Sequence, residues 1–128
     1  MVTAITDGIK ISVVTEYQPV YSNPTLSHFV FTYNITIENN SGFTIQLLQR
    51  HWDIVDSNGE TREVDGEGVI GQQPLLEPGE KYNYVSGCNF KTPIGKMSGN
   101  YTMERIFDGR SFIVKIPDFT MIVPYLLN

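Results

Sequence analysis

Three glycines with the spacing of a phosphate-binding motif are the residues most suggestive of chemistry. Gly66, Gly68 and Gly71 occur in the order Gly-Glu-Gly-Val-Ile-Gly, the fingerprint with which a helix N-terminus binds the pyrophosphate of a dinucleotide. The segment that follows contains Pro74 and Pro78, and each proline would interrupt the helix that such a site needs. The motif therefore does not predict a dinucleotide-binding fold.

Two interpretations remain for residues 66–71, which we call the glycine loop. In the first, backbone N–H groups around Gly66, Gly68 and Gly71 form a nest that binds a phosphate or pyrophosphate group. In the second, the glycines only allow the positive φ that a long loop or a bulge requires. The carboxylates within and beside the loop would repel an anion, and no basic residue lies between Glu63 and Glu80.

A second candidate is a metal site at His51 and Asp53, which have the same parity and would point to the same side of a strand. Asp56, Asp65 and Glu67 could add oxygen ligands; cobalt accepts imidazole and carboxylate, whereas magnesium prefers oxygen. The alternative is a solvated sheet face. Because no ligand spacing of the zinc type occurs, we predict no bound metal and no cofactor.

A catalytic site would need a nucleophile with an adjacent base. Cys88 with His28 or His51 is the pairing that the residue types allow, but no nucleophile elbow or other supporting motif accompanies it. A cysteine at a strand end is more often a small packed hydrophobe. We therefore predict that the protein is not an enzyme.

Composition excludes several classes of protein. The chain has 128 residues, 41% of them hydrophobic, and a net charge of −5, which repels nucleic acid phosphates at long range. No apolar run is long enough to span a membrane, and the N-terminus lacks the basic and apolar regions of a signal peptide. With a single cysteine, the chain fits a reducing compartment. We predict a cytoplasmic protein that binds neither nucleic acid nor membrane.

The segments that must position these residues have the period-two pattern of β-strands. Residues 29–38 alternate almost strictly between apolar and polar. Residues 43–56 alternate with a change of parity at Leu47-Leu48, which predicts a β-bulge or a strand that changes its buried face. Trp52 is expected to be the largest core anchor. Further strands are expected from residue 9, at 61–65, 82–86 and 97–107, and at 112–116 before Pro117, with an apolar tail at 119–127 that docks.

Turn signals separate these strands. Asn58-Gly59 and Asp108-Gly109 are hairpin signals, and Pro78-Gly79 is typical of a type II turn. About seven or eight short strands with such spacing predict a β-sandwich.

Several residue strings then point to a known family. Gly-Glu-Gly-Val-Ile-Gly-Gln-Gln-Pro at 66–74 is followed by Leu-Glu-Pro-Gly-Glu at 76–80 and Tyr-Val-Ser-Gly-Cys at 84–88. Upstream lie Arg-His-Trp-Asp-Ile at 50–54 and Gly59. The matching positions downstream are Thr92-Pro93, Gly95, Met97, Gly99, Tyr101, Met103, Asp108-Gly109, Phe112, Val114, Ile116-Pro117 and Phe119. Together these strings resemble the central signature of the ApaG family, in the same order and over nearly the whole chain.

The resemblance implies a single ApaG domain over residues 1–128 with an immunoglobulin- or fibronectin-type-III-like β-sandwich. Bacterial members are described as cobalt/magnesium efflux-associated, and related domains in eukaryotic F-box proteins and in a polymerase-delta-interacting protein look like protein-binding modules. No catalytic activity is attached to the family. The resemblance therefore implies a protein-interaction module associated with divalent-cation homeostasis, with phosphate binding at the glycine loop as the alternative.

A protein partner would bind at an edge strand or at an exposed sheet face. The tyrosines Tyr17, Tyr21, Tyr82 and Tyr84 are candidates for such a face. The opposing interpretation is that most of them fill the core. A homodimer formed through one edge is compatible with the same pattern.

Overall fold

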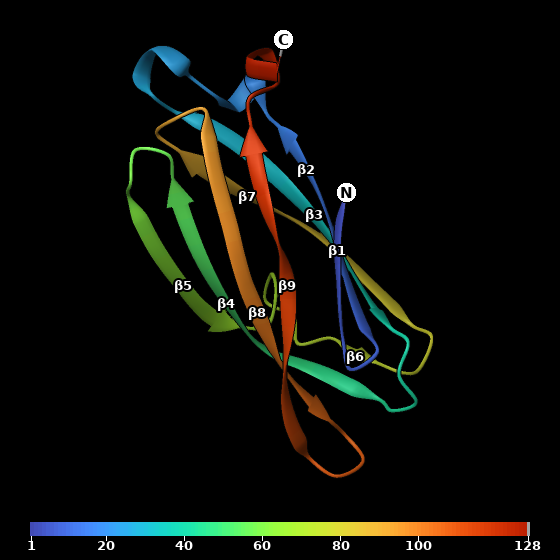
Figure 1. Cartoon of the computed structure of the whole chain (residues 1–128). Coiled ribbons are helices and arrows are strands. Elements are labelled where there is room, and N and C mark those ends of the chain that lie inside the picture. Colours follow the sequence, from blue (N-terminus) through green and yellow to red (C-terminus); the bar gives the residue numbers. More distant parts are fainter. Residues whose placement is uncertain (128) are drawn as a thin grey trace.

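Two antiparallel sheets stacked face to face make up the computed structural model, which describes residues 1–127 (Figure 1). The first sheet has the order β1-β2-β3-β7, with β1 at Val2–Thr6, β2 at Ile9–Tyr17, β3 at Phe29–Asn39 and β7 at Lys81–Phe90. The second has the order β5-β4-β8-β9, with β5 at Thr61–Glu67, β4 at Ile45–Asp56, β8 at Ile94–Arg105 and β9 at Arg110–Ile122. β6 at Leu75–Leu76 also pairs with β4, and three short 3-10 helices are η1 at Pro19–Tyr21, η2 at Pro24–Leu26 and η3 at Pro124–Leu127.

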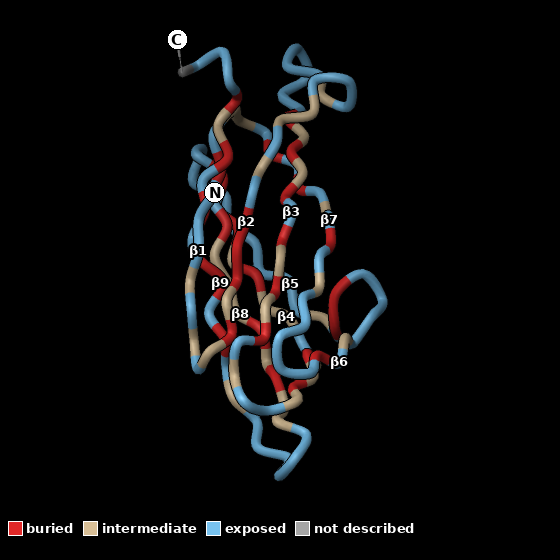
Figure 2. Tube along the Cα trace, turned by 90° about the vertical axis from the view of Figure 1, so that its right-hand side faces the viewer, coloured by how far each residue is buried: buried red, intermediate tan, exposed pale blue. Residues whose placement is uncertain are grey.

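This arrangement confirms the predicted immunoglobulin- or fibronectin-type-III-like β-sandwich. Alternation in β3 places five side chains in the core, namely Phe29, Phe31, Tyr33, Ile35 and Ile37. Buried residues, drawn in red in Figure 2, occur on strands of both sheets. Period two therefore produces one continuous core between two layers.

Trp52 has the core position that the sequence predicts. Its side chain is 2% exposed. The ring centroid lies 5.4 Å from that of Tyr33 on the facing sheet and 5.8 Å from that of Phe119, both in edge-on geometry. Trp52 thus connects the two layers and the last strand.

The predicted bulge and turns are confirmed. The register of β4 against β8 shifts between Leu47 and Gln49, which moves the buried parity from Leu47 to Trp52. Gly59, Gly79 and Gly109 have the positive φ of the three predicted turns, at 92°, 89° and 69°.

The sequence predicts that the last strand ends before Pro117, and this prediction is wrong. β9 continues to Ile122, because β9 is an edge strand and its register against β8 shifts between Met97 and Gly99. A proline without an N–H is tolerated at an edge and at a bulge. The apolar tail is therefore strand up to Ile122 and 3-10 helix from Pro124 to Leu127; the side chain of Leu127 lies outside the described residues.

The first strand, β1, was not expected from the sequence. Asp7 and Gly8, with φ of 49° and 80°, form the turn that joins β1 to β2. Together with the two-residue β6, β1 brings the number of strands in residues 1–127 to nine.

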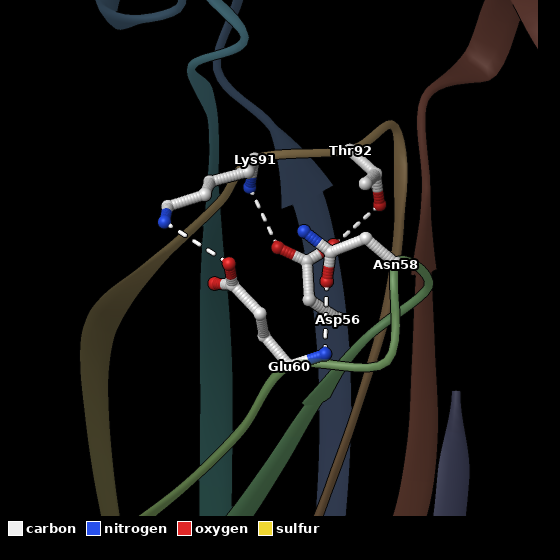
Figure 3. A network of polar contacts seen from close by, with 5 residues as sticks. All are labelled: Asp56, Asn58, Glu60, Lys91 and Thr92. Atoms are coloured by element: carbon white, nitrogen blue, oxygen red, sulfur yellow. Dashed lines mark hydrogen bonds and ion pairs between the residues drawn. The ribbon is translucent and has the colours of Figure 1, made fainter.

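A buried carboxylate joins the two sheets at one end (Figure 3). Asp56, at the end of β4, accepts hydrogen bonds from the backbone N–H of Lys91 at 2.7 Å and from the hydroxyl of Thr92, which both follow β7. The Lys91 ammonium also pairs with Glu60 at 3.2 Å, and Asn58 accepts a bond from the Glu60 N–H at 2.9 Å. Asp56 therefore has a structural role away from His51.

Candidate functional site

The glycine loop is a compact turn that uses several of its own N–H groups. Gly68, Ile70 and Gly71 have positive φ of 58°, 47° and 71°. The N–H of Gly68 donates to the carbonyl oxygen of Leu48 at 2.8 Å, and Val69 and Gln72 exchange two backbone hydrogen bonds at 2.8 and 2.9 Å. In Figure 2 this loop projects from the right-hand side of the sandwich above the β6 label. Because these N–H groups form hydrogen bonds within the protein, an anion would have to bind through the remaining backbone N–H groups of the glycine loop.

Arg50 is the residue that the sequence analysis missed at this loop. Its guanidinium lies directly over Gly66, where an added Cβ would be only 2.7 Å from the Arg50 Cζ. Its Nη1 donates to the carbonyl oxygens of Glu67 and Gly68, both at 3.0 Å. The signal was present in the sequence, because a hairpin turning at Asn58-Gly59 places residue 50 opposite residue 66.

The structure brings Gly68 and Gly71 together in the turn and places Gly66 in β5. Anion binding at Gly66, Gly68 and Gly71 stays a prediction. The loop geometry explains each glycine separately: Gly66 leaves room for a guanidinium, while Gly68 and Gly71 take up left-handed backbone.

We expect Gly68→Val to destabilise the protein by about 1–3 kcal/mol, because φ is positive there and a Cβ would lie 2.0 Å from the carbonyl oxygen of Gln72. Gly71→Ala is the matched control, with positive φ but open space around its Cβ. Its smaller cost of about 1 kcal/mol reflects backbone strain alone. Urea denaturation measures the loss of stability in both variants. A Gly68→Val urea midpoint equal to that of the native protein would contradict the steric argument.

His51 lies on the outer face of β4 between two carboxylates. Its Nδ1 is 2.7 Å from Oδ1 of Asp65, and its Nε2 is 3.1 Å from Oδ2 of Asp53. The hydrogen bond with Asp65 is the main cause that raises the pKa of His51, and Asp53 adds to it against partial desolvation. The structure thus brings His51, Asp53 and Asp65 together, but both ring nitrogens are occupied.

Within residues 1–127 no group of three or more His, Cys, Asp or Glu side chains is arranged to hold a metal ion. His51 and Asp53 stay weak candidates for a metal. Both ring nitrogens of His51 already contact carboxylates, so a metal would have to displace one of these contacts to bind there.

This arrangement predicts a pH dependence of stability. A raised native pKa means that the charged imidazole contributes stability below pH about 6.5 and that this contribution is lost as pH rises through the native pKa. We therefore expect the stability difference between the native protein and His51→Gln to shrink on going from acidic to alkaline pH. Imidazole NMR titration should show a lower His51 midpoint in Asp65→Asn and no change in Asp118→Asn, whose carboxylate pairs with Lys96. A native midpoint at the ordinary histidine value would contradict the assignment.

Cys88 does not face either histidine. It lies on β7 with its Sγ 3.2 Å from Nη2 of Arg62. His51 lies on the outer face of β4 between its two carboxylates, and His28 is exposed just before β3. Burial raises the pKa of the Cys88 thiol, with Arg62 acting in the opposite direction. Both observations describe a packed thiol.

Most of the four candidate tyrosines do not lie on an exposed face where a partner could bind. Tyr84 is buried, and its hydroxyl is 2.5 Å from that of Tyr101; burial is the main cause that raises the pKa of both phenols. Tyr17 and Tyr82 pack against the core, and Tyr21 alone of the four is exposed. The interpretation that most of these tyrosines fill the core is therefore confirmed, and the surface interpretation is wrong for Tyr84.

An exposed apolar cluster lies at the end of the sandwich where the β8–β9 hairpin turns, the brown loop at the bottom of Figure 1. Phe107 is 84% exposed, Ile106 44% and Phe43 43%. These three side chains border one hollow of about 450 Å³, and the N–H of Ile106 donates to the carbonyl oxygen of Thr44 at 3.0 Å. We call Phe43, Ile106 and Phe107 the hairpin-end cluster.

The fold and the site describe an all-β sandwich domain with a glycine-rich loop beside one edge strand. A family model described as the ApaG domain matches residues 19–105. The chain belongs to the ApaG family.

Known relatives cover the chain almost completely. Protein ApaG of Anaeromyxobacter dehalogenans is 47% identical over 128 residues, all of both chains. Protein ApaG of Brucella canis is 45% identical over 97% of this chain and 95% of its own. A crystal structure of the ApaA protein from Bordetella pertussis is 41% identical, with a TM-score of 0.88 over 91% of this chain and 94% of its own.

In the part of the chain that the structure describes, no helix has the length and apolar character needed to cross a membrane.

Proposed function

We propose that residues 1–128 form a single ApaG domain that acts by binding another protein and catalyses no reaction. The observation that carries this proposal is the hairpin-end cluster. Large apolar side chains gathered at one place on a surface are typical of a protein-binding site, and aromatic residues and arginine are enriched in such sites.

The hairpin-end cluster also has an arginine beside its aromatic residues, as protein-binding sites often do. The guanidinium of Arg105 lies 4.5 Å above the ring of Phe43. Arg105 also forms an ion pair with Asp108 in the hairpin turn, and this pair lowers the pKa of the Asp108 carboxyl to about 2. Because this ion pair restricts the turn, Phe107 loses little conformational entropy on binding a partner, and this favours affinity.

The association with cobalt and magnesium homeostasis is part of the proposal and rests on the family resemblance. A domain that binds a protein can influence cation efflux through that partner without holding a metal itself. A cytoplasmic location belongs to the same proposal and is supported by the single, buried and unbridged Cys88.

The test is a comparison of captured proteins from an extract of the source cells. We expect the immobilised native protein to retain a partner that Phe107→Asp loses, since a charge at the centre of an apolar contact is costly to desolvate. Val20→Asp is the matched control, because Val20 is 87% exposed in η1 at the opposite end of the sandwich (Figure 1). Retention of the same proteins by Phe107→Asp, with its fold intact, would contradict the proposal. Light scattering of the two variants tests a homodimer through the same cluster.

Phosphate or pyrophosphate binding at the glycine loop is the second candidate function. The guanidinium of Arg50 favours it, because this cation lies beside a loop that the sequence alone showed as acidic. Titration of pyrophosphate against labelled backbone amides is the test. Saturable shifts confined to Gly66, Gly68 and Gly71 would support it, and unchanged loop amides would rule it out.

A further inference from the structure

The sandwich is closed along one side and open along the other. On the closed side β9 packs beside β1 and β2, and the N–H of Lys115 donates to the hydroxyl of Thr6 at 3.3 Å. On the other side the edge strands β5 and β7 border a cleft of about 260 Å³ whose lining reaches Tyr33 and Trp52. We call this hollow the β5–β7 cleft.

The β4–β5 ladder places three residue pairs in one row along this cleft. In order they are Arg50 with Gly66, Trp52 with Val64, and Ile54 with Arg62. Opposite residues in an antiparallel pair point to the same face, so an arginine lies near each end of the row with an apolar pair between. Positions 62 and 66 are about 13 Å apart along the strand; the two charges therefore belong to one elongated cleft.

Neither cleft arginine has an acidic partner. Among residues 1–127, ion pairs engage Lys10, Lys81, Lys91, Lys96 and Arg105, but not Arg50 or Arg62. Arg62 instead donates through Nη2 to the carbonyl oxygen of Asn89 at 2.5 Å, and Arg50 donates through Nη1 to loop carbonyls. A guanidinium has further N–H donors, so both can still bind an anion. Two guanidinium groups without an ion-pair partner in one cleft stand out in a chain with a net charge of −5.

Neutral hydroxyl donors complete the lining. Tyr33 and Ser86 both border the cleft, and burial raises the pKa of the Tyr33 phenol, with Ser86 and Arg50 opposing. Tyr33 therefore stays protonated and able to donate at neutral pH.

We propose that the β5–β7 cleft binds a small elongated organic anion, with an acidic group toward Arg50, another toward Arg62, and an apolar middle against Trp52 and Val64. The planar fork of arginine matches carboxylate and phosphate groups alike, so the ligand class is a compact diacid. This site is separate from the hairpin-end cluster and does not depend on it.

The size of the cleft limits the ligand. Pockets for drug-sized molecules measure roughly 300–1,000 Å³, and the β5–β7 cleft has about 260 Å³. A dinucleotide is too large for it, whereas an aliphatic diacid fits.

The experiment titrates the labelled full-length protein with α,ω-dicarboxylates from succinate to sebacate and with the monocarboxylate of each length. We expect saturable amide shifts at Val64, Ser86 and Cys88, an affinity that peaks within the diacid series, and binding at least about tenfold weaker for the matching monoacid. Alkyl bisphosphonates of the same lengths distinguish phosphorus oxyanions from carboxylates as the preferred group.

Variants locate the binding. Arg50→Lys and Arg62→Gln should each weaken the best diacid about tenfold or more, while Arg110→Gln, an arginine outside the cleft, should not. If the arginine variants are unstable, Val64→Glu provides the second test, because it adds a repelling carboxylate to the middle of the row. Val85→Glu is its control, with the same change on the outer face of β7.

Three results would overturn the proposal. These three concern the titrations and the cleft variant: no saturable binding of any diacid or bisphosphonate, equal binding of mono- and diacids, or unchanged affinity in Val64→Glu. Binding of an extended acidic peptide without any diacid would also overturn it. Loss of a protein partner in Phe107→Asp is a separate result and bears only on the hairpin-end cluster.

Discussion

Replacing Trp52 with alanine is expected to lower the free energy of unfolding by about 3–5 kcal/mol. The side chain is almost fully buried and touches aromatic rings from both layers, Tyr33 on β3 and Phe119 on β9. Truncation removes the transfer free energy of the indole and leaves a cavity that rigid strands on both sides cannot fill.

The measurement is urea denaturation followed by far-UV circular dichroism, because Trp52 is the only tryptophan and its loss removes the fluorescence signal. Phe107→Ala is the control: its ring is exposed, so we expect a change within about 0.5 kcal/mol. A Trp52→Ala midpoint equal to that of the control, with an unchanged denaturant slope, would show that Trp52 is not the core anchor.

Replacing Gly99 with alanine is expected to cost about 3 kcal/mol, at the upper end of ordinary overpacking. The new Cβ would lie 2.1 Å from the backbone carbonyl oxygen of His51 and 3.1 Å from Cε3 of Trp52. Both obstacles lie in β4, and β4 and β8 are the two central strands of their sheet. Neither strand can move away without breaking a ladder on its other side.

Gly87→Ala provides the matched control for Gly99→Ala. Gly87 also lies within a strand, but its added Cβ would be an ordinary 3.6 Å from the carbonyl oxygen of Phe31, and β7 is an edge strand that can adjust. We expect Gly87→Ala to melt within a few degrees of the native protein and Gly99→Ala to melt about 10 °C lower. Similar melting temperatures for the two variants would contradict the close-approach argument.

Local pattern was sufficient for most of the fold. The alternation of β3, the bulge at Leu48 and the turns at Gly59, Gly79 and Gly109 follow from side-chain period and backbone φ. Both are properties of a few consecutive residues and do not depend on what packs against them.

Two strand boundaries depended on neighbours and were mispredicted. β1 forms because it pairs with β2, and β9 continues through Pro117 because its free edge needs no N–H there. Pairing partners decide such boundaries, and residues near them in the chain carry little information about them.

The features of the candidate sites also divide into those that follow from local sequence and those that depend on tertiary neighbours. The amino-acid sequence by itself determined the β-sandwich class, the buried Trp52 and the bend at Gly68, because period two and positive φ are local requirements. Only the tertiary structure decided that the Arg50 guanidinium covers Gly66, that His51 lies between two carboxylates, and that Phe43 and Phe107 border one hollow. The physical reason is that charge and apolar surface act through space, so their partners are set by strand register and sheet stacking rather than by order along the chain.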